Sequence, residues 1–155
     1  MKDKAMPVLL TLCGSSGDGS GEMDENIRVI TTGQLKQTPS GYMLRYQETQ
    51  TDEGDGSVMT QDIILSMQPG RVTMTRLGDY GTSMVFVKDC RFEGKYHTPY
   101  GDLDMALFAT HVQCDLTPER GSVSLKYQLD LQGSFAAMHA LRLEYVTGES
   151  APKPC

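Results

Sequence analysis

Two residues of opposite charge, Glu48 and Arg76, lie in segments whose apolar residues recur at every second position. If Leu44 and Tyr46 face the interior of a sheet, the alternation of an extended strand turns Glu48 inward as well. The same counting places Arg76 on the face that carries Met74. Burial of one unpaired charge costs several kcal/mol, so we expect the carboxylate and the guanidinium to meet inside the protein.

Hydroxyl groups are expected around this ion pair from Tyr46, Tyr96 and Tyr127. A structural interpretation is that the pair plugs one end of a barrel, or that Glu48 ends its strand in water. A functional interpretation is that Arg76 binds the carboxylate of a ligand in an otherwise apolar interior. A desolvated Glu48 beside Tyr96 or Tyr127 would also suit acid-base catalysis. The sequence leaves these alternatives open.

The remaining candidate residues do not form a catalytic or metal-binding motif. The cysteines contain no C-x-x-C pair, and no nucleophile elbow, phosphate loop or dinucleotide-binding fingerprint occurs. Asp102 and Asp104 share one face of a strand, but a third oxygen ligand at a recognisable spacing is missing, so we expect a solvated face. The histidines are interpreted as ordinary side chains: His97, His111 and His139. We therefore predict no metal site and no cofactor.

Strand periodicity dominates the chain. From Val123 to Leu131, apolar residues alternate with polar ones, which is typical of a strand with one buried face. The same rhythm recurs in other segments: residues 42–48, 59–67, 71–77, 92–98 and 141–145. Gly, Pro and Asp mark turns between them, and no segment is long enough for the helix of a parallel crossover. We therefore predict an all-β fold, an antiparallel up-and-down barrel of about 8–10 strands.

Length and composition predict one domain. A chain of 155 residues can bury a substantial core, and we assign residues 1–149 to a single barrel domain. Residues 14–26 are small, flexible and acidic, and they predict a mobile loop, with a lid over the mouth of the barrel as the alternative. Residues 150–155 predict a disordered tail.

Charge and hydropathy argue against two classes of partner. Fourteen Lys and Arg against twenty Asp and Glu give a net charge of −6, which disfavours binding to nucleic acid. No apolar run reaches the length of a membrane-spanning helix, and residues 5–13 are interpreted as a first strand rather than a signal peptide.

Four cysteines are too few for a secreted disulfide scaffold, so we expect reduced thiols and a cytoplasmic protein.

Several segments together resemble a known bacterial family. They are residues 42–48 (YMLRYQE), 75–78 (TRLG), 96–105 (YHTPYGDLDM) and 121–127 with Gly133, and the T-P-Y-G run is the most specific. In this order and spacing they are similar to the YwiB-like proteins, a bacterial domain of unknown function placed among calycin-like β-barrels. The similarity runs from about Val8 to Tyr145. The resemblance implies a barrel related in shape to lipocalins and fatty-acid-binding proteins, and it implies no established activity.

The function predicted from the residues is binding of a small apolar or amphipathic molecule, which could carry a carboxylate, in the barrel interior. The expected ligand-binding residues are Glu48, Arg76, Tyr46, Tyr96 and Tyr127. An enzyme with an acid-base pair of Glu and Tyr is a less favoured alternative, and a solid barrel that binds another protein is a third. We expect no nucleic acid or membrane as partner, and the sequence does not indicate an oligomeric state.

Overall fold

The computed structural model describes residues 5–17, 23–51, 54, 56–78, 81–98 and 101–147. Strands account for nearly all of this part of the chain: β1 (Met6–Gly17), β2 (Met23–Thr38), β3 (Gly41–Thr51), β4 (Val58–Gln68), β5 (Arg71–Arg76), β6 (Thr82–Val87), β7 (Arg91–Thr98), β8 (Gly101–Leu116), β9 (Arg120–Leu131) and β10 (Ser134–Thr147). Within the described ranges the chain forms no helix long and apolar enough to cross a membrane. The prediction of an all-β fold is confirmed.

The strands form one sheet of ten strands in the order β6-β5-β4-β3-β2-β1-β10-β9-β8-β7. Consecutive strands are antiparallel neighbours from β1 to β6 and from β7 to β10, and β1 pairs with β10. Glycines in the left-handed region serve the tight turns, as at Gly70 (φ 77°) and Gly133 (φ 79°). The result is the antiparallel up-and-down barrel that the alternation predicted.

The sheet closes on itself between β6 and β7 without a regular ladder. The Thr82 hydroxyl donates a hydrogen bond to the carbonyl of Lys95 at 2.8 Å. Beyond the end of β6, the Asp89 N–H donates to the carbonyl of Ala109 at 2.7 Å, beside a parallel bridge between Lys88 and Ala109. These contacts join the two edges of the sheet, so the barrel is nearly closed.

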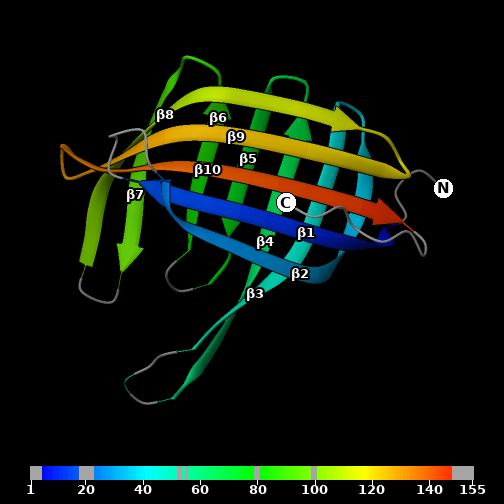
Figure 1. Ribbon diagram of the computed structural model, residues 1–155, viewed down its shortest axis with the longest axis horizontal. Coiled ribbons are helices and arrows are strands. Elements are labelled where there is room, and N and C mark those ends of the chain that lie inside the picture. The colour runs from blue at the N-terminus through cyan, green and yellow to red at the C-terminus, as the bar shows by residue number, and fades with distance from the viewer. Residues whose placement is uncertain are drawn as a thin grey trace.

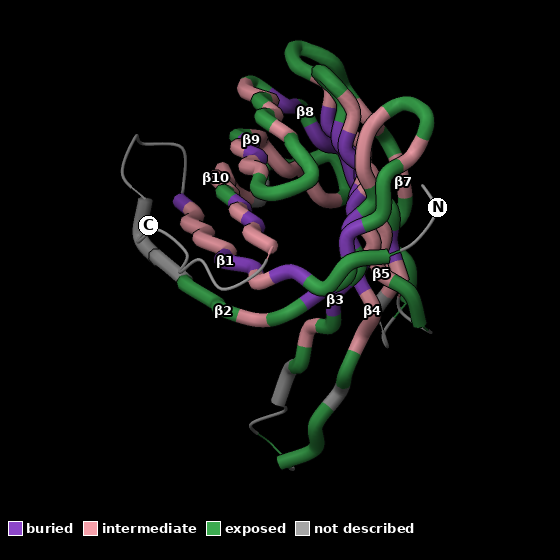
Figure 2. Tube along the Cα trace, turned by 90° about the vertical axis from the view of Figure 1, so that its right-hand side faces the viewer, coloured by how far each residue is buried: buried purple, intermediate pink, exposed green. Residues whose placement is uncertain are grey.

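The barrel is flattened into two layers whose strands cross (Figure 1). Strands β1, β9 and β10 run across the front, and β4, β5 and β6 cross steeply behind them. Buried segments lie where the two layers face each other, while the outer ends of β3 and β4 are exposed and project away from the barrel (Figure 2). Val58, at the start of β4, is 64% exposed, so this projecting hairpin contributes little to the core.

The core is built from the inward-facing residues of both layers. Leu10, Leu44 and Phe86 have no exposed surface, and Leu107 and Leu125 are each 1% exposed. The residues next to them on their strands are mostly more exposed, as a strand with one buried face requires. Apolar side chains from nearly every strand form one cluster, so the middle of the barrel is filled by the protein itself.

The prediction of a mobile loop at residues 14–26 is wrong at both of its ends. β1 continues to Gly17, and β2 begins at Met23. The small residues at the end of β1 stay extended because β10 pairs with them on one side and β2 on the other. The rest of the predicted loop or lid, residues 18–22, lies outside the described residues, as does the predicted tail.

The expectation of reduced thiols is met at two of the described cysteines. Cys90 and Cys114 are free thiols, whereas Cys13 is disulfide-bonded. Burial raises the pKa of the Cys114 thiol, which keeps it protonated at neutral pH. The expectation is therefore wrong for Cys13.

Candidate functional site

A row of inward-facing residues crosses four strands at one end of the barrel. Tyr46 on β3 lies opposite Ile63 on β4. Ile63 in turn lies opposite Arg76 on β5, and Arg76 lies opposite Thr82 on β6. Glu48 follows two residues after Tyr46 on the same face of β3. The alternation of β3 and β5 therefore brings a carboxylate, a phenol and a guanidinium to the same end of the barrel.

The predicted ion pair is present at this end. Arg76 Nη1 lies 3.5 Å from Glu48 Oε1, and the side chains of Arg76 and Glu48 are 27% and 31% exposed. A close charge-assisted hydrogen bond would measure ~2.7–2.9 Å, so this contact is loose. Arg76 Nε is buried and has no hydrogen-bond partner in the part of the chain that the structure describes. A buried donor without a partner costs about 1–3 kcal/mol, so an acceptor supplied by a ligand would stabilise the site.

Tyr46 borders the ion pair from a buried position. The residue is 6% exposed. Burial raises the pKa of its hydroxyl to about 12, with the charge of Glu48 adding to the rise and that of Arg76 opposing it. The phenol therefore stays protonated at neutral pH, where it can donate a hydrogen bond but is a poor base.

The facing wall of the site consists of Tyr127 on β9 and His139 on β10, which lie directly opposite each other in the ladder. Their rings stack with centroids 5.1 Å apart and planes at 21°. Phe86 packs edge-on against Tyr127, with centroids 4.9 Å apart. Burial raises the pKa of Tyr127 and lowers the pKa of His139, so both side chains are uncharged at neutral pH. This wall is therefore aromatic and neutral.

The two walls border a pocket with a volume of about 350 Å³. Small-molecule sites typically measure ~300–1,000 Å³, so the pocket is at the lower end of that range. Its apolar floor is formed by leucine and methionine side chains: Leu12, Met74, Met84 and Leu141. Methionine side chains adapt to irregular shapes, which suits a floor for the apolar part of a ligand.

The inward faces of β1 and β3 become accessible where β2 and β3 part. β2 pairs with β3 only from Gly33 to Thr38, whereas it pairs with β1 as far as Met23. Beyond Tyr46, β3 pairs with β4 alone among the described residues. A Cβ atom on Gly33 would lie 2.7 Å from the Arg45 carbonyl, so the close approach at the branch point requires glycine. Past this point the two strands diverge (Figure 2).

Most of the predicted site residues line the pocket: Tyr46, Glu48, Arg76 and Tyr127. Tyr96 is not among its lining residues, because it lies on β7 opposite Leu103 and is 37% exposed. His139 does line the pocket, although sequence analysis assigned it no role. The signal that could have identified His139 is its place on the same face of β10 as Leu141 and Leu143.

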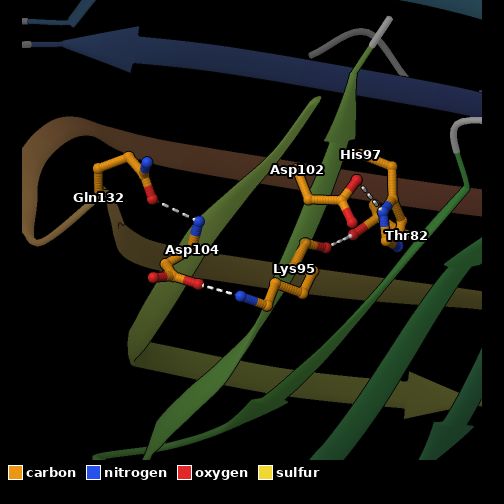
Figure 3. A network of polar contacts seen from close by, with 6 residues as sticks. All are labelled: Thr82, Lys95, His97, Asp102, Asp104 and Gln132. Atoms are coloured by element: carbon orange, nitrogen blue, oxygen red, sulfur yellow. Dashed lines mark hydrogen bonds and ion pairs between the residues drawn. The ribbon is translucent and has the colours of Figure 1, made fainter. Parts of the chain in front are cut away.

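On the outer face of β7 and β8, charged side chains pair across the ladder (Figure 3). Lys95 forms an ion pair with Asp104, and His97 Nδ1 lies 2.8 Å from Asp102 Oδ1. The Asp104 N–H donates a hydrogen bond to Gln132 Oε1 at 2.7 Å. Both aspartate side chains are more than half exposed, as expected for a solvated face. The described residues contain no group of three or more His, Cys, Asp or Glu that could hold a metal ion.

A second hollow, of about 510 Å³, lies on the outer face over β1, β9 and β10. Ser15 and Ala140 line it, and exposed cations lie along it: Arg28, Lys126 and Arg142. Arg142 is already engaged, because its Nη2 lies 2.8 Å from Glu144 Oε1. This hollow offers exposed charge, whereas the inner pocket combines a buried donor with an apolar floor.

Comparison with known proteins places the chain in a family. The model of a family described as a domain of unknown function (DUF1934) matches residues 12–143. The chain belongs to this family. A relative, the "uncharacterized beta-barrel protein YwiB" of Bacillus subtilis (strain 168), is 27% identical over 133 residues, which cover 84% of this chain and 89% of the relative. The resemblance to the YwiB-like proteins is confirmed.

The fold is shared with a solved structure of the same family. The crystal structure of the YwiB protein from Bacillus subtilis matches with a TM-score of 0.78 at 23% sequence identity, and the match covers 96% of each chain. This likeness establishes the β-barrel. The names of these relatives state no ligand and no reaction, so the case for a function has to come from the pocket.

Proposed function

We propose that this protein binds a small amphipathic molecule whose carboxylate contacts Arg76 at the open end of the barrel. The observation that carries the proposal is the buried Arg76 Nε, which has no hydrogen-bond partner among the described residues. The apolar part of the ligand packs on the floor that Leu12 and Met74 help to form. The Tyr46 hydroxyl, which stays protonated, supplies a further donor.

The architecture supports a site at one end of the barrel. Small calycin-like barrels such as lipocalins hold a single small ligand. In this chain the middle of the barrel is filled by its own apolar side chains, so the ligand occupies the pocket beside Arg76 rather than the length of the interior. This packing favours a compact ligand over a long one.

The two alternative functions have weaker support. Catalysis by Glu48 with a tyrosine is disfavoured because burial raises the pKa of both Tyr46 and Tyr127, and a phenol that keeps its proton at neutral pH is a poor general base. A solid barrel that binds only other proteins agrees with the packed middle of the barrel. This function does not explain the pocket or the buried Arg76 Nε.

We also propose that the protein acts in the cytoplasm. The thiols of Cys90 and Cys114 are stable in that reducing compartment, whereas a disulfide at Cys13 is unusual there. Alkylation of the protein as isolated, followed by mass mapping, separates the possibilities. We expect Cys90 and Cys114 to be alkylated and Cys13 to be protected by its disulfide, and oxidation of Cys90 and Cys114 as well would point to an oxidising compartment.

Calorimetric titration with octanoate and phenylpropanoate tests the binding function. A charge-assisted hydrogen bond contributes about 1.5–3 kcal/mol, so we expect Arg76→Gln to weaken binding by about tenfold or more. Arg45→Gln is the matched control, because Arg45 lies on the outward face of β3 and its side chain is 54% exposed. We expect this control to bind as the wild-type protein does. Equal affinity of wild-type and Arg76→Gln protein would contradict the proposal.

A further inference from the structure

The described lining of the pocket holds one fixed charge of each sign, and we infer that the ligand is a zwitterion of the α-amino acid class with an apolar side chain. The inference rests on the binding function proposed above and specifies the ligand of the same site. The ligand carboxylate binds Arg76, and its ammonium group binds Glu48. The apolar side chain packs on the leucine and methionine floor.

Charge is the first argument for a zwitterion. Arg76 Nη1 and Glu48 Oε1 are 3.5 Å apart, so an anion seated on Arg76 also lies close to the carboxylate of Glu48. Like charges a few ångströms apart repel each other, and this repulsion offsets much of the attraction to the guanidinium. A bare amine seated on Glu48 is repelled by Arg76 for the same reason. A ligand with both groups makes two attractions at once, and these offset the repulsions.

The geometry of the ion pair is the second argument. One contact of 3.5 Å is not a bidentate pair, and the Nε edge of Arg76 has no partner among the described residues. The ligand carboxylate can therefore take that edge while Nη1 stays near Glu48. A carboxylate accepts several hydrogen bonds, so Glu48 can receive an ammonium donor and keep its present contacts.

The other titratable side chains in the described lining add no charge. Tyr46 and Tyr127 stay protonated because burial raises their pKa, and His139 stays neutral because burial lowers its pKa. A neutral imidazole does not repel an ammonium group. One guanidinium and one carboxylate thus leave the described lining with no net charge, which matches a zwitterion and matches neither a simple anion nor a simple cation.

The size of the pocket indicates a single amino acid. A volume of about 350 Å³ corresponds to roughly a dozen water molecules at ~30 Å³ each. This is the size class of one amino acid with a large side chain. Met74 and Met84 in the floor can adjust to side chains of different shape, so we expect a preference for apolar amino acids over polar ones.

Calorimetric titration with three related probes tests the inference. Phenylalanine carries both charged groups, phenylpropanoate carries only the carboxylate, and phenethylamine carries only the ammonium group. We expect wild-type protein to bind phenylalanine about tenfold or more tightly than either of the others. Glu48→Gln is expected to remove the preference over phenylpropanoate. Asp62→Asn, which removes a carboxylate paired with Arg45 on the outer face, is expected to leave it unchanged.

The outcomes separate the inference from the function on which it rests. If wild-type protein binds phenylpropanoate as tightly as phenylalanine, the zwitterion is wrong and the binding function stands. If the preference survives in Glu48→Gln, the ammonium group does not bind Glu48 and the inference is again wrong. If none of the three probes and no octanoate binds, both fail. The comparison of probes on wild-type protein does not depend on the folding of any variant.

Discussion

The inward-facing polar groups at the two ends of the barrel differ in their hydrogen-bond partners. At one end, the Tyr145 hydroxyl donates a hydrogen bond to the Thr117 carbonyl at 2.7 Å, and Tyr145 is 1% exposed. At the other end, Arg76 and Glu48 share one loose contact, and the buried Arg76 Nε has no partner among the described residues. The Tyr145 hydroxyl thus has an acceptor within the protein, whereas Arg76 Nε is a buried donor without a described acceptor.

The backbone around each end explains the difference. At the Tyr145 end, Gly121 lets the aromatic ring lie against the chain, since a Cβ atom there would lie 2.4 Å from ring carbons of Tyr145. At the Arg76 end, β2 and β3 part beyond the pair of Gly33 and Tyr46, so the ladder between the described parts of these strands does not continue over the side chains behind them. One end is closed by close packing, and the other is left accessible by a branch in the sheet.

The largest expected effect comes from a methyl group added at the closed end. Gly121→Ala forces the buried Tyr145 ring to move, and we expect it to lower the free energy of unfolding by roughly 3 kcal/mol. Gly14→Ala is the control at the open end, where the new Cβ would make an ordinary contact of 3.9 Å with the Ala140 carbonyl. We expect a change within about 0.5 kcal/mol. Similar losses in urea denaturation of the two variants would remove the contrast between the ends.

Alkaline pH probes how deeply the open end is buried. The pKa of Tyr46 is about 12 in the folded protein and 10.0 in an unfolded chain. Its contribution is therefore fully present below pH 10 and is lost as the pH rises toward 12, when the unfolded state ionises first; two pKa units correspond to roughly 3 kcal/mol. Urea denaturation across this pH range should show a weaker pH dependence for Tyr46→Phe. An identical dependence in both proteins would place Tyr46 in water.

A pair of tyrosine variants compares the hydroxyl groups of the two ends. Tyr145→Phe leaves the Thr117 carbonyl without its donor, and we expect a loss of about 1–2 kcal/mol. Tyr127→Phe should change stability by less than about 0.5 kcal/mol, because no described residue forms a hydrogen bond with the Tyr127 hydroxyl. Thermal unfolding of both variants measures the difference. A larger loss of stability for Tyr127→Phe would mean that the Tyr127 hydroxyl also forms a hydrogen bond within the protein.

The sequence was sufficient to predict which residues face inward where apolar and polar residues alternate regularly along a strand. Glu48 and Arg76 follow inward-facing residues on strands with regular pairing, so counting by two places both correctly. Tyr96 has the same parity as Phe92, but β7 has no regular ladder on its β6 side, and alternation alone does not reveal where a strand end lies relative to a pocket. Parity therefore predicts the face of a side chain better than its position along the barrel.

Strand register and local composition limited the prediction of His139 and of the end of β1. His139 faces Tyr127 only in the observed pairing of β9 and β10, which includes an irregularity between Phe135 and Ala137 that the sequence does not reveal. The small residues at the end of β1 predict a loop, but pairing with β10 on one side and β2 on the other keeps Gly14 and Ser15 in the strand. In both regions, contacts between distant segments decide the local structure.

The most direct test of the account is the NMR signal of the Arg76 Nε–H group, assigned by its loss in the Arg76→Lys variant. Addition of phenylalanine or phenylpropanoate, whichever binds more tightly, should shift this proton downfield and slow its exchange with water, because the buried donor gains an acceptor. An unchanged Nε–H signal at saturating ligand, while signals of Tyr127 and His139 shift, would contradict the claim that Arg76 holds the ligand.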